Sequence, residues 1–223
     1  MNPLQTIELN PGDAPTATVV ILHGLGADGT DFLSMADELH LDAVGPVRFV
    51  FPRAPVRRVT INGGQPMRAW YDILGADLAK REDEAGLRES FAQVHQLLDR
   101  EVARGVPASR IVLAGFSQGC AVTLGAGLRY GERLAGLVGL SGYVPLADTL
   151  AAERRDANRI TPVFLAHGRS DGMVPLSRGS AGRDLLLGQG QPVEWHDYPM
   201  QHSVCMEEVQ ALQAWLLRVL QPA

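Results

Sequence analysis

A serine between two glycines is the first feature of this 223-residue chain that could carry chemistry. Ser117 lies between Gly115 and Gly119 in the segment LAGFSQGCA, where an apolar run ends and a helical pattern begins. A strand–turn–helix junction of this kind exposes the serine hydroxyl, because the glycines remove side chains that would collide with neighbouring backbone. The alternative is an ordinary serine that caps a helix. The flanking strand and helix favour Ser117 as a nucleophile.

A serine hydroxyl attacks a carbonyl readily only when a base removes its proton and a third group orients that base. Asp171 and His202 are the candidates, because each lies in a loop that follows a predicted strand. The order Ser, Asp, His along the chain is the one expected when three loops meet at one edge of a parallel sheet. We therefore predict a Ser117–His202–Asp171 triad that catalyses acyl transfer.

Other histidines and carboxylates are weaker candidates for these two roles. His196 and Asp197 fall inside a predicted strand, where side chains point across the sheet rather than over its edge. Asp184 falls in a helical stretch, and His167 precedes its loop, so packing or local hydrogen bonding is the simpler interpretation. His23 is likewise predicted to be a structural hydrogen-bonding residue.

An ester-cleaving site also needs hydrogen-bond donors for the oxyanion. The backbone N–H of Gln118, directly after the serine, is predicted to be one donor. The other is the N–H of Leu25 in the glycine-rich segment HGLGADG, which follows the first strong strand pattern. A plain glycine turn is the alternative for that segment.

The elements that must position these groups are short apolar runs alternating with amphipathic stretches. The apolar runs predict strands at 16–24, 47–52, 110–116, 134–142 and 161–168, and an alternating run predicts a strand nearer an edge at 192–199. Helical patterns cover 84–104, 121–128 and 204–220. This alternation predicts an α/β fold, a mostly parallel doubly wound sheet with helices on both faces, in a single domain over 1–223.

Composition indicates which kinds of partner and which cellular compartment to expect for this chain. The formal net charge is −5 and the arginines form no stripe, so no nucleic-acid partner is expected. No apolar stretch approaches the ~20 residues that span a bilayer, and no signal peptide is visible, so we expect a cytoplasmic protein without membrane insertion. Cys120 and Cys205 have no zinc-like spacing and are expected as free thiols. The predicted chemistry requires no metal or organic cofactor.

Six motifs, in order along the chain, resemble those of bacterial carboxylesterases related to acyl-protein thioesterases and lysophospholipases. They are HGLGADGTDF, RFVFPRAPVRRVTINGGQPMRAWYDI, GFSQGCAV, LSGYVP, HGRSDGMVP and YPMQHSV. The resemblance implies an α/β-hydrolase fold in which Ser117 is the nucleophile, Asp171 the acid and His202 the base. It also implies that Leu25 and Gln118 supply the oxyanion donors.

The same resemblance places Trp70, in the segment AWYDI, near the substrate. Two positions depart from the family pattern. Cys120 stands where relatives usually carry a small residue, which changes packing behind the serine without affecting the chemistry. Tyr143 stands where tryptophan is common, which would reshape one wall of the site.

The long mixed stretch Ala54–Ala76 is a candidate functional loop, because loops of this length are uncommon in compact domains. The stretch 142–161 is too short for the helical cap that many relatives carry, so we expect little or no cap and an open groove. The groove would be walled by Ile61, Met67, Trp70, Ile73 and Leu74, with plain loop packing as the alternative. Such a groove would accept short-to-medium acyl chains and bulky leaving groups.

The activity predicted from the sequence is therefore a serine carboxylesterase acting on a small-molecule ester through an acyl-enzyme intermediate. An acyl-protein thioesterase or lysophospholipase with the same triad is the alternative, and peptidase or lactonase action stays open. A non-catalytic binding module is a further alternative, although such modules usually lose a triad member. Activity should fall as the histidine base becomes protonated near neutral pH. A homodimer is plausible.

Overall fold

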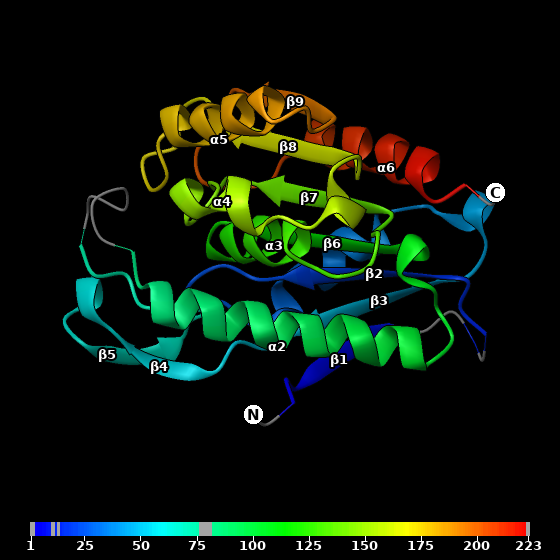
Figure 1. Ribbon diagram of the computed structural model, residues 1–223, viewed down its shortest axis with the longest axis horizontal. Helices are drawn as coiled ribbons and strands as arrows, with labels where there is room; N and C mark the ends of the chain where they lie inside the picture. Colours follow the sequence, from blue (N-terminus) through cyan, green and yellow to red (C-terminus); the bar gives the residue numbers. More distant parts are fainter. Residues whose placement is uncertain (1–2, 10–11, 13, 76–81, 222–223) are drawn as a thin grey trace.

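A twisted seven-stranded sheet forms the centre of the computed structural model, which describes residues 3–9, 12, 14–75 and 82–221 (Figure 1). The strand order is β1-β3-β2-β6-β7-β8-β9, and every neighbouring pair is parallel except β1 with β3. The strands are β1 (Thr6–Leu9), β2 (Ala17–Leu22), β3 (Val47–Pro52), β6 (Ile111–Phe116), β7 (Gly136–Leu140), β8 (Val163–Gly168) and β9 (Val193–Tyr198).

The burial of the strands follows their sequence patterns. Every residue of β2, β3, β7 and β8 is buried, as expected for apolar strands covered on both faces. All six residues of β9 are half-buried, and β9 pairs only with β8, which confirms its prediction as an edge strand. Strand β1 was not predicted from the sequence, because its four half-buried residues TIEL form no apolar run and pair with β3 through their backbone.

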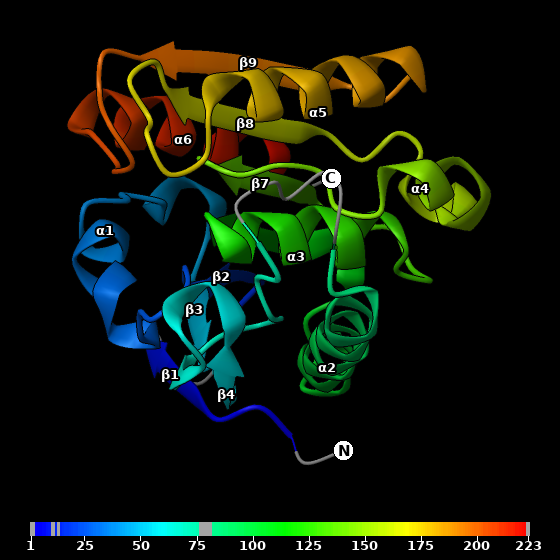
Figure 2. The same cartoon turned by 90° about the vertical axis from the view of Figure 1, so that its left-hand side faces the viewer.

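Helices cover both faces of the sheet (Figure 2). One face carries α1 (Leu33–Asp37) and α6 (Met206–Val219), and the other carries α2 (Glu84–Ala103), α3 (Gln118–Leu128), α4 (Ala147–Glu153) and α5 (Leu176–Gly188). The predicted apolar stripe of α2 packs into the second of these layers. Between β7 and β8 the chain forms only α4 and a 3₁₀ turn, so no helical cap is inserted there.

The stretch predicted as a long irregular loop contains regular structure instead. Within Ala54–Ala76, β4 (Val56–Val59) and β5 (Gln65–Arg68) form an antiparallel hairpin, and Ala76 lies outside the described residues. Gly63 and Gly64, which have positive φ values of 66° and 75°, reverse the chain between the two strands. Half of the residues in these four-residue strands are exposed, and the strands lack the apolar alternation by which strands are predicted.

The connectivity of the sheet creates a crevice at one point of its edge. After β2 the chain adds β3 on one side, whereas after β6 it adds β7, β8 and β9 on the other side. Because β2 and β6 are neighbours, the loops that follow them diverge from a shared position at their carboxyl ends. This is the position at which open α/β sheets bind their ligands.

Within the described residues, the structure contains no helix with the length and hydrophobicity needed to cross a bilayer.

Candidate active site

Ser117 occupies a strained turn between β6 and α3. Its φ and ψ are 56° and −116°, a backbone conformation that side-chain-bearing residues rarely adopt. The Ser117 N–H donates to the carbonyl of Leu140 at 2.9 Å, which ties the turn to β7. The side chain makes no capping hydrogen bond to α3, so the alternative of a helix-capping serine is excluded.

The two glycines around Ser117 permit the close packing of this turn. A Cβ on Gly115 would lie 2.2 Å from the carbonyl oxygen of Gly119. A Cβ on Gly119 would lie 2.2 Å from the carbonyl oxygen of Leu22 at the end of β2. Both distances are shorter than non-bonded carbon–oxygen contacts in real structures. Glycine is therefore required at both positions, because α3 packs so closely against β6 and β2 that no side chain fits there.

The structure brings the three predicted triad residues together. His202 Nε2 lies 2.9 Å from Ser117 Oγ, and His202 Nδ1 lies 2.7 Å from Asp171 Oδ2. Because an ionised carboxylate only accepts hydrogen bonds, Nδ1 carries the proton and Nε2 is free to accept the serine proton. The imidazole packs against Phe116, with 4.8 Å between ring centroids. The arrangement can therefore remove the proton from the serine hydroxyl.

The carboxylate of Asp171 is fully buried and held by its own loop. Its Oδ1 accepts hydrogen bonds from the N–H groups of Met173 at 2.9 Å and Val174 at 2.8 Å. His167 Nε2 lies 2.8 Å from the Val174 carbonyl oxygen and 3.5 Å from Asp171 Oδ2. His167 therefore hydrogen-bonds locally, as predicted, and supports the loop after β8 that carries Asp171, called the acid loop below. The N–H groups of Met173 and Val174 stabilise the buried negative charge of Asp171 beside the His202 imidazole.

The two predicted oxyanion donors lie at the same crevice as Ser117. Leu25 and Gln118 both line the cleft into which the serine opens. A Cβ on Gly24 would lie 3.4 Å from Ser117 Cβ, so the loop after β2 passes beside Ser117. Gln118 is the first residue of α3, so its N–H has no acceptor in a preceding helical turn.

A cleft of about 750 Å³ surrounds these groups. It is mainly apolar, with lining residues contributed by the β4–β5 hairpin, by the acid loop and by the turns after β2 and β6. Three residues of the predicted wall, Ile61, Met67 and Ile73, line this cleft. Its volume falls within the range of sites that enclose small organic ligands.

Two residues of the predicted wall, Trp70 and Leu74, do not line the cleft. Trp70 is fully buried, and its indole N–H donates to the carbonyl of His23 at 2.9 Å. The cleft is lined instead by the next residue, Tyr71. Phe116 and Met173 also line the cleft and were not predicted to do so, because no periodicity in the sequence marks them.

A family model described as Phospholipase/Carboxylesterase matches residues 5–220. The chain belongs to this family. Acyl-protein thioesterase 1 of Yarrowia lipolytica is 39% identical over 221 residues, covering 97% of this chain and 97% of that protein. Acyl-protein thioesterase 1 of Schizosaccharomyces pombe is 40% identical over 212 residues, covering 94% and 93%. The crystal structure of Zea mays acyl-protein thioesterase 2 matches with a TM-score of 0.86 at 30% identity, covering 97% of this chain and 99% of that one.

Membership of the phospholipase/carboxylesterase family makes this chain a serine hydrolase with an α/β-hydrolase fold. The structure shows the surroundings of Tyr143 and Cys120, the two residues expected from the sequence to depart from the family pattern. Tyr143 lines the cleft, and its phenol oxygen lies 2.8 Å from that of Tyr71. Burial raises the pKa of Tyr143 to about 12 and that of Tyr71 well above its usual value, so both phenols are neutral.

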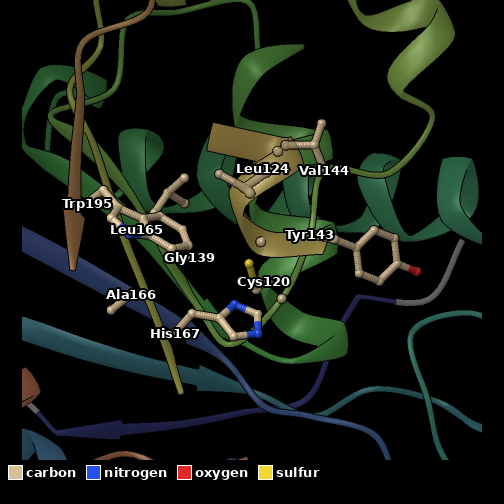
Figure 3. A pocket seen from close by; sticks show the side chains of 12 residues that line it. Cys120, Leu124, Gly139, Tyr143, Val144, Leu165, Ala166, His167 and Trp195 are labelled. Carbon is tan, nitrogen blue, oxygen red and sulfur yellow. The ribbon is translucent and has the colours of Figure 1, made fainter. Parts of the chain in front are cut away.

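The second of these residues, Cys120, fills space behind the serine. Its sulfur lies where two neighbouring glycines, Gly139 and Gly142, leave room for it, since a Cβ on either would come within 2.8 Å of Sγ. Figure 3 shows the thiol among the apolar residues around it, with the Tyr143 ring extending away from the group. The remaining hollow of about 10 Å³ holds at most one water. Burial raises the pKa of Cys120 to about 12, so the thiol is no competing nucleophile.

The rival residues lie elsewhere in the described structure. His196 hydrogen-bonds Glu194 at 3.0 Å within β9, and Asp197 pairs with Arg169. Asp184 lies in α5 and pairs with Arg183. Among the described residues, no three histidine, cysteine or carboxylate side chains are grouped as metal ligands would be.

Proposed function

We propose that this serine hydrolase cleaves esters and thioesters with short-to-medium acyl chains, using Ser117, His202 and Asp171 as its triad. One observation supports the proposal above all. Hydrogen bonds of 2.9 and 2.7 Å connect Ser117 Oγ through His202 to Asp171, at the wall of a mainly apolar cleft. The cleft offers room for an acyl chain directly beside the hydroxyl.

The proposed reaction has two acyl-transfer steps. Ser117 Oγ bonds to the carbonyl carbon of the substrate as its proton passes to His202 Nε2, and the carbonyl electron pair moves onto oxygen. The N–H groups of Leu25 and Gln118 stabilise that oxyanion. Collapse breaks the bond to the alcohol or thiol, which receives the proton from His202. Water then repeats the sequence on the acyl-enzyme and releases the carboxylic acid, while Asp171 stabilises the imidazolium in both steps.

The cleft supports a preference for apolar acyl groups. Ile61, Met67 and Ile73 offer aliphatic and thioether surface along the hairpin side, and Ile61 is 45% exposed at the rim. An open rim tolerates bulky leaving groups, because a leaving group can remain in solvent while the acyl chain is bound. We expect activity on p-nitrophenyl esters to peak at short-to-medium chains; a steep preference for very long chains would contradict an open groove.

Thioester hydrolysis is the second candidate, and the relatives named acyl-protein thioesterase favour it. The same triad serves both leaving groups, since a thiolate leaves more readily than an alkoxide. Matched oxygen esters and thioesters of one acyl chain, together with a lysophospholipid, separate the alternatives. We expect turnover of the first two classes, with the ratio of their kcat/KM values identifying the preferred linkage.

The controls for this panel are Ser117→Ala and a fluorophosphonate probe. Ser117→Ala should abolish turnover and labelling while the thermal unfolding transition is retained. Residual turnover at more than about one thousandth of the wild-type rate would point to another nucleophile, since the triad serine supplies a larger factor than this.

Four further expectations from the sequence are proposals about the whole protein. We expect a single domain over residues 1–223, a cytoplasmic location and a place among the bacterial members of the family. A homodimer is also proposed. Light scattering on the purified chain measures its mass against the 24.0 kDa of one copy and decides between monomer and dimer.

A further inference from the structure

The loop that carries Leu25 is oriented by two buried side chains outside the cleft. We propose that His23 is a positioning residue, which aims the Leu25 N–H at the oxyanion, and that Trp70 holds His23 in place. The inference rests on the proposed function, in which the Leu25 N–H contacts the substrate oxygen. His23 and Trp70 are both fully buried, so neither touches substrate.

The tautomer of His23 follows from its two hydrogen bonds. The N–H of Ala54 donates to Nε2 at 3.0 Å, so Nε2 carries a lone pair. Nδ1 therefore carries the proton and donates it to the carbonyl oxygen of Gly24 at 2.7 Å. Burial lowers the pKa of His23, which keeps the ring neutral in this arrangement.

The bond from His23 controls the direction of the oxyanion donor through one rigid unit. The carbonyl of Gly24 and the N–H of Leu25 belong to the same planar peptide group and point in opposite directions. Fixing the Gly24 oxygen on the His23 side therefore directs the Leu25 N–H away from it. The N–H of Ala27 donates to the same carbonyl at 3.3 Å and closes the turn. The peptide can no longer rotate without breaking both bonds.

Trp70 fixes the backbone from which this imidazole projects. Its indole N–H donates to the His23 carbonyl at 2.9 Å, and the two rings lie 5.4 Å apart. The Trp70 backbone is clamped in turn, because its N–H donates to Gln118 Oε1 at 2.7 Å and its carbonyl accepts from Ser90. The side chain of Gln118 thus connects the residue after the nucleophile to the support of the other oxyanion donor.

The test compares variants that remove or retain the donor at the His23 Nδ1 position. His23→Leu removes it, whereas the amide nitrogen of His23→Asn can occupy the place of Nδ1. We expect His23→Leu to lower kcat about 100-fold with KM little changed, because oxyanion stabilisation acts on the transition state. His23→Asn should recover at least about tenfold of that loss. Affinity for a trifluoromethyl ketone, which forms a tetrahedral adduct with the serine, should fall in parallel with kcat.

A second pair of variants tests Trp70 independently. Trp70→Phe removes the indole donor and should lower kcat about tenfold, while Trp215→Phe is the matched control. Trp215 is also buried, in α6 on the opposite face of the sheet, so its replacement should lower the unfolding temperature without lowering kcat. Benzothienylalanine at position 70 keeps the ring shape without the N–H and separates the hydrogen bond from packing.

The outcomes distinguish this inference from the proposed function. Folded His23→Leu and Trp70→Phe proteins with kcat and ketone affinity within twofold of wild type would overturn the positioning role. Equal losses of kcat in Trp70→Phe and Trp215→Phe would overturn the role of Trp70. A wild-type protein without Ser117-dependent turnover would instead overturn the proposed function itself.

Discussion

Gly168 lies directly beneath the backbone of Gln201, and a Cβ on Gly168 would be 2.2 Å from the Gln201 carbonyl oxygen. Gly168 ends β8, whereas Gln201 directly precedes His202 in the loop after β9. Strands are spaced by about 4.8 Å, so the end of β9 lies ~14 Å from the end of β6 and from Ser117. The loop must therefore run back over β8, and the missing side chain at Gly168 lets it do so.

Replacing Gly168 with alanine should displace the loop that carries His202. We expect kcat of Gly168→Ala to fall about 100-fold, since a shift of this size misplaces the base relative to Ser117. Steady-state kinetics with a p-nitrophenyl ester measure the effect. Gly188→Ala, at an exposed glycine with no atom near the added carbon, is the matched control and should keep wild-type kcat. Unchanged kcat in Gly168→Ala would show that the crossing does not constrain the base.

Replacing Asp171 with asparagine should remove the charge that orients the imidazole. We expect kcat of Asp171→Asn to fall about 10⁴-fold, because an amide can donate to Nδ1 and favour the wrong tautomer. Single-turnover kinetics measure the acylation step. Asp184→Asn, on the exposed side of α5, provides the control. A loss below about tenfold would indicate that another acid serves the histidine.

Glu208 should make stability depend on pH through its buried carboxyl group. Burial raises the pKa of this carboxyl from 4.5 to about 8, against a smaller opposing effect of the Cys205 backbone. The folded state therefore holds a proton that the unfolded state releases between about pH 4.5 and about pH 8. Its contribution to stability is fully present below that window and is lost as pH rises through it.

The variant Glu208→Gln keeps a neutral side chain at every pH and tests this contribution. The unfolding temperature of the wild type, relative to that of Glu208→Gln, should fall as pH rises from about 4.5 to about 8. Glu207→Gln, on the exposed side of the same helical turn, is the control for removing a carboxyl. A difference between wild type and Glu208→Gln that stays constant with pH would show that the carboxyl is ionised throughout.

Glu101 should contribute strongly to the free energy of unfolding. It lies near the amino-terminal ends of β2 and β3, whereas the active site lies at the carboxyl ends of the strands. Its fully buried carboxylate lies 2.8 Å from Arg48 and 2.8 Å from Arg104, and it accepts from Thr18 at 3.4 Å. We expect Glu101→Gln to lower the free energy of unfolding by about 3–5 kcal/mol, since it leaves the buried guanidinium of Arg48 facing a neutral amide. Urea titration measures the change. Glu84→Gln, at an exposed ion pair, should cost less than about 1 kcal/mol.

Local sequence patterns predicted most of the central sheet, because burial on both faces demands continuous apolar runs. They also placed Ser117, Asp171 and His202 after three of the predicted strands, where side chains can reach the sheet edge. The hairpin β4–β5 and the strand β1 escaped prediction. Their pairing depends on backbone hydrogen bonds to residues that are distant or of mixed polarity, and no local periodicity records such pairing.

What the sequence by itself determined is which residues stand at the ends of strands, since strand and helix patterns are set by near neighbours. Tertiary structure decided the direction that the chain takes after the end of each strand. It buried Trp70 and directed Tyr71 into the cleft, and it carried His202 back across Gly168 to within 2.9 Å of Ser117. Such directions depend on contacts between residues far apart along the chain, because only the packed neighbours exclude the other available paths.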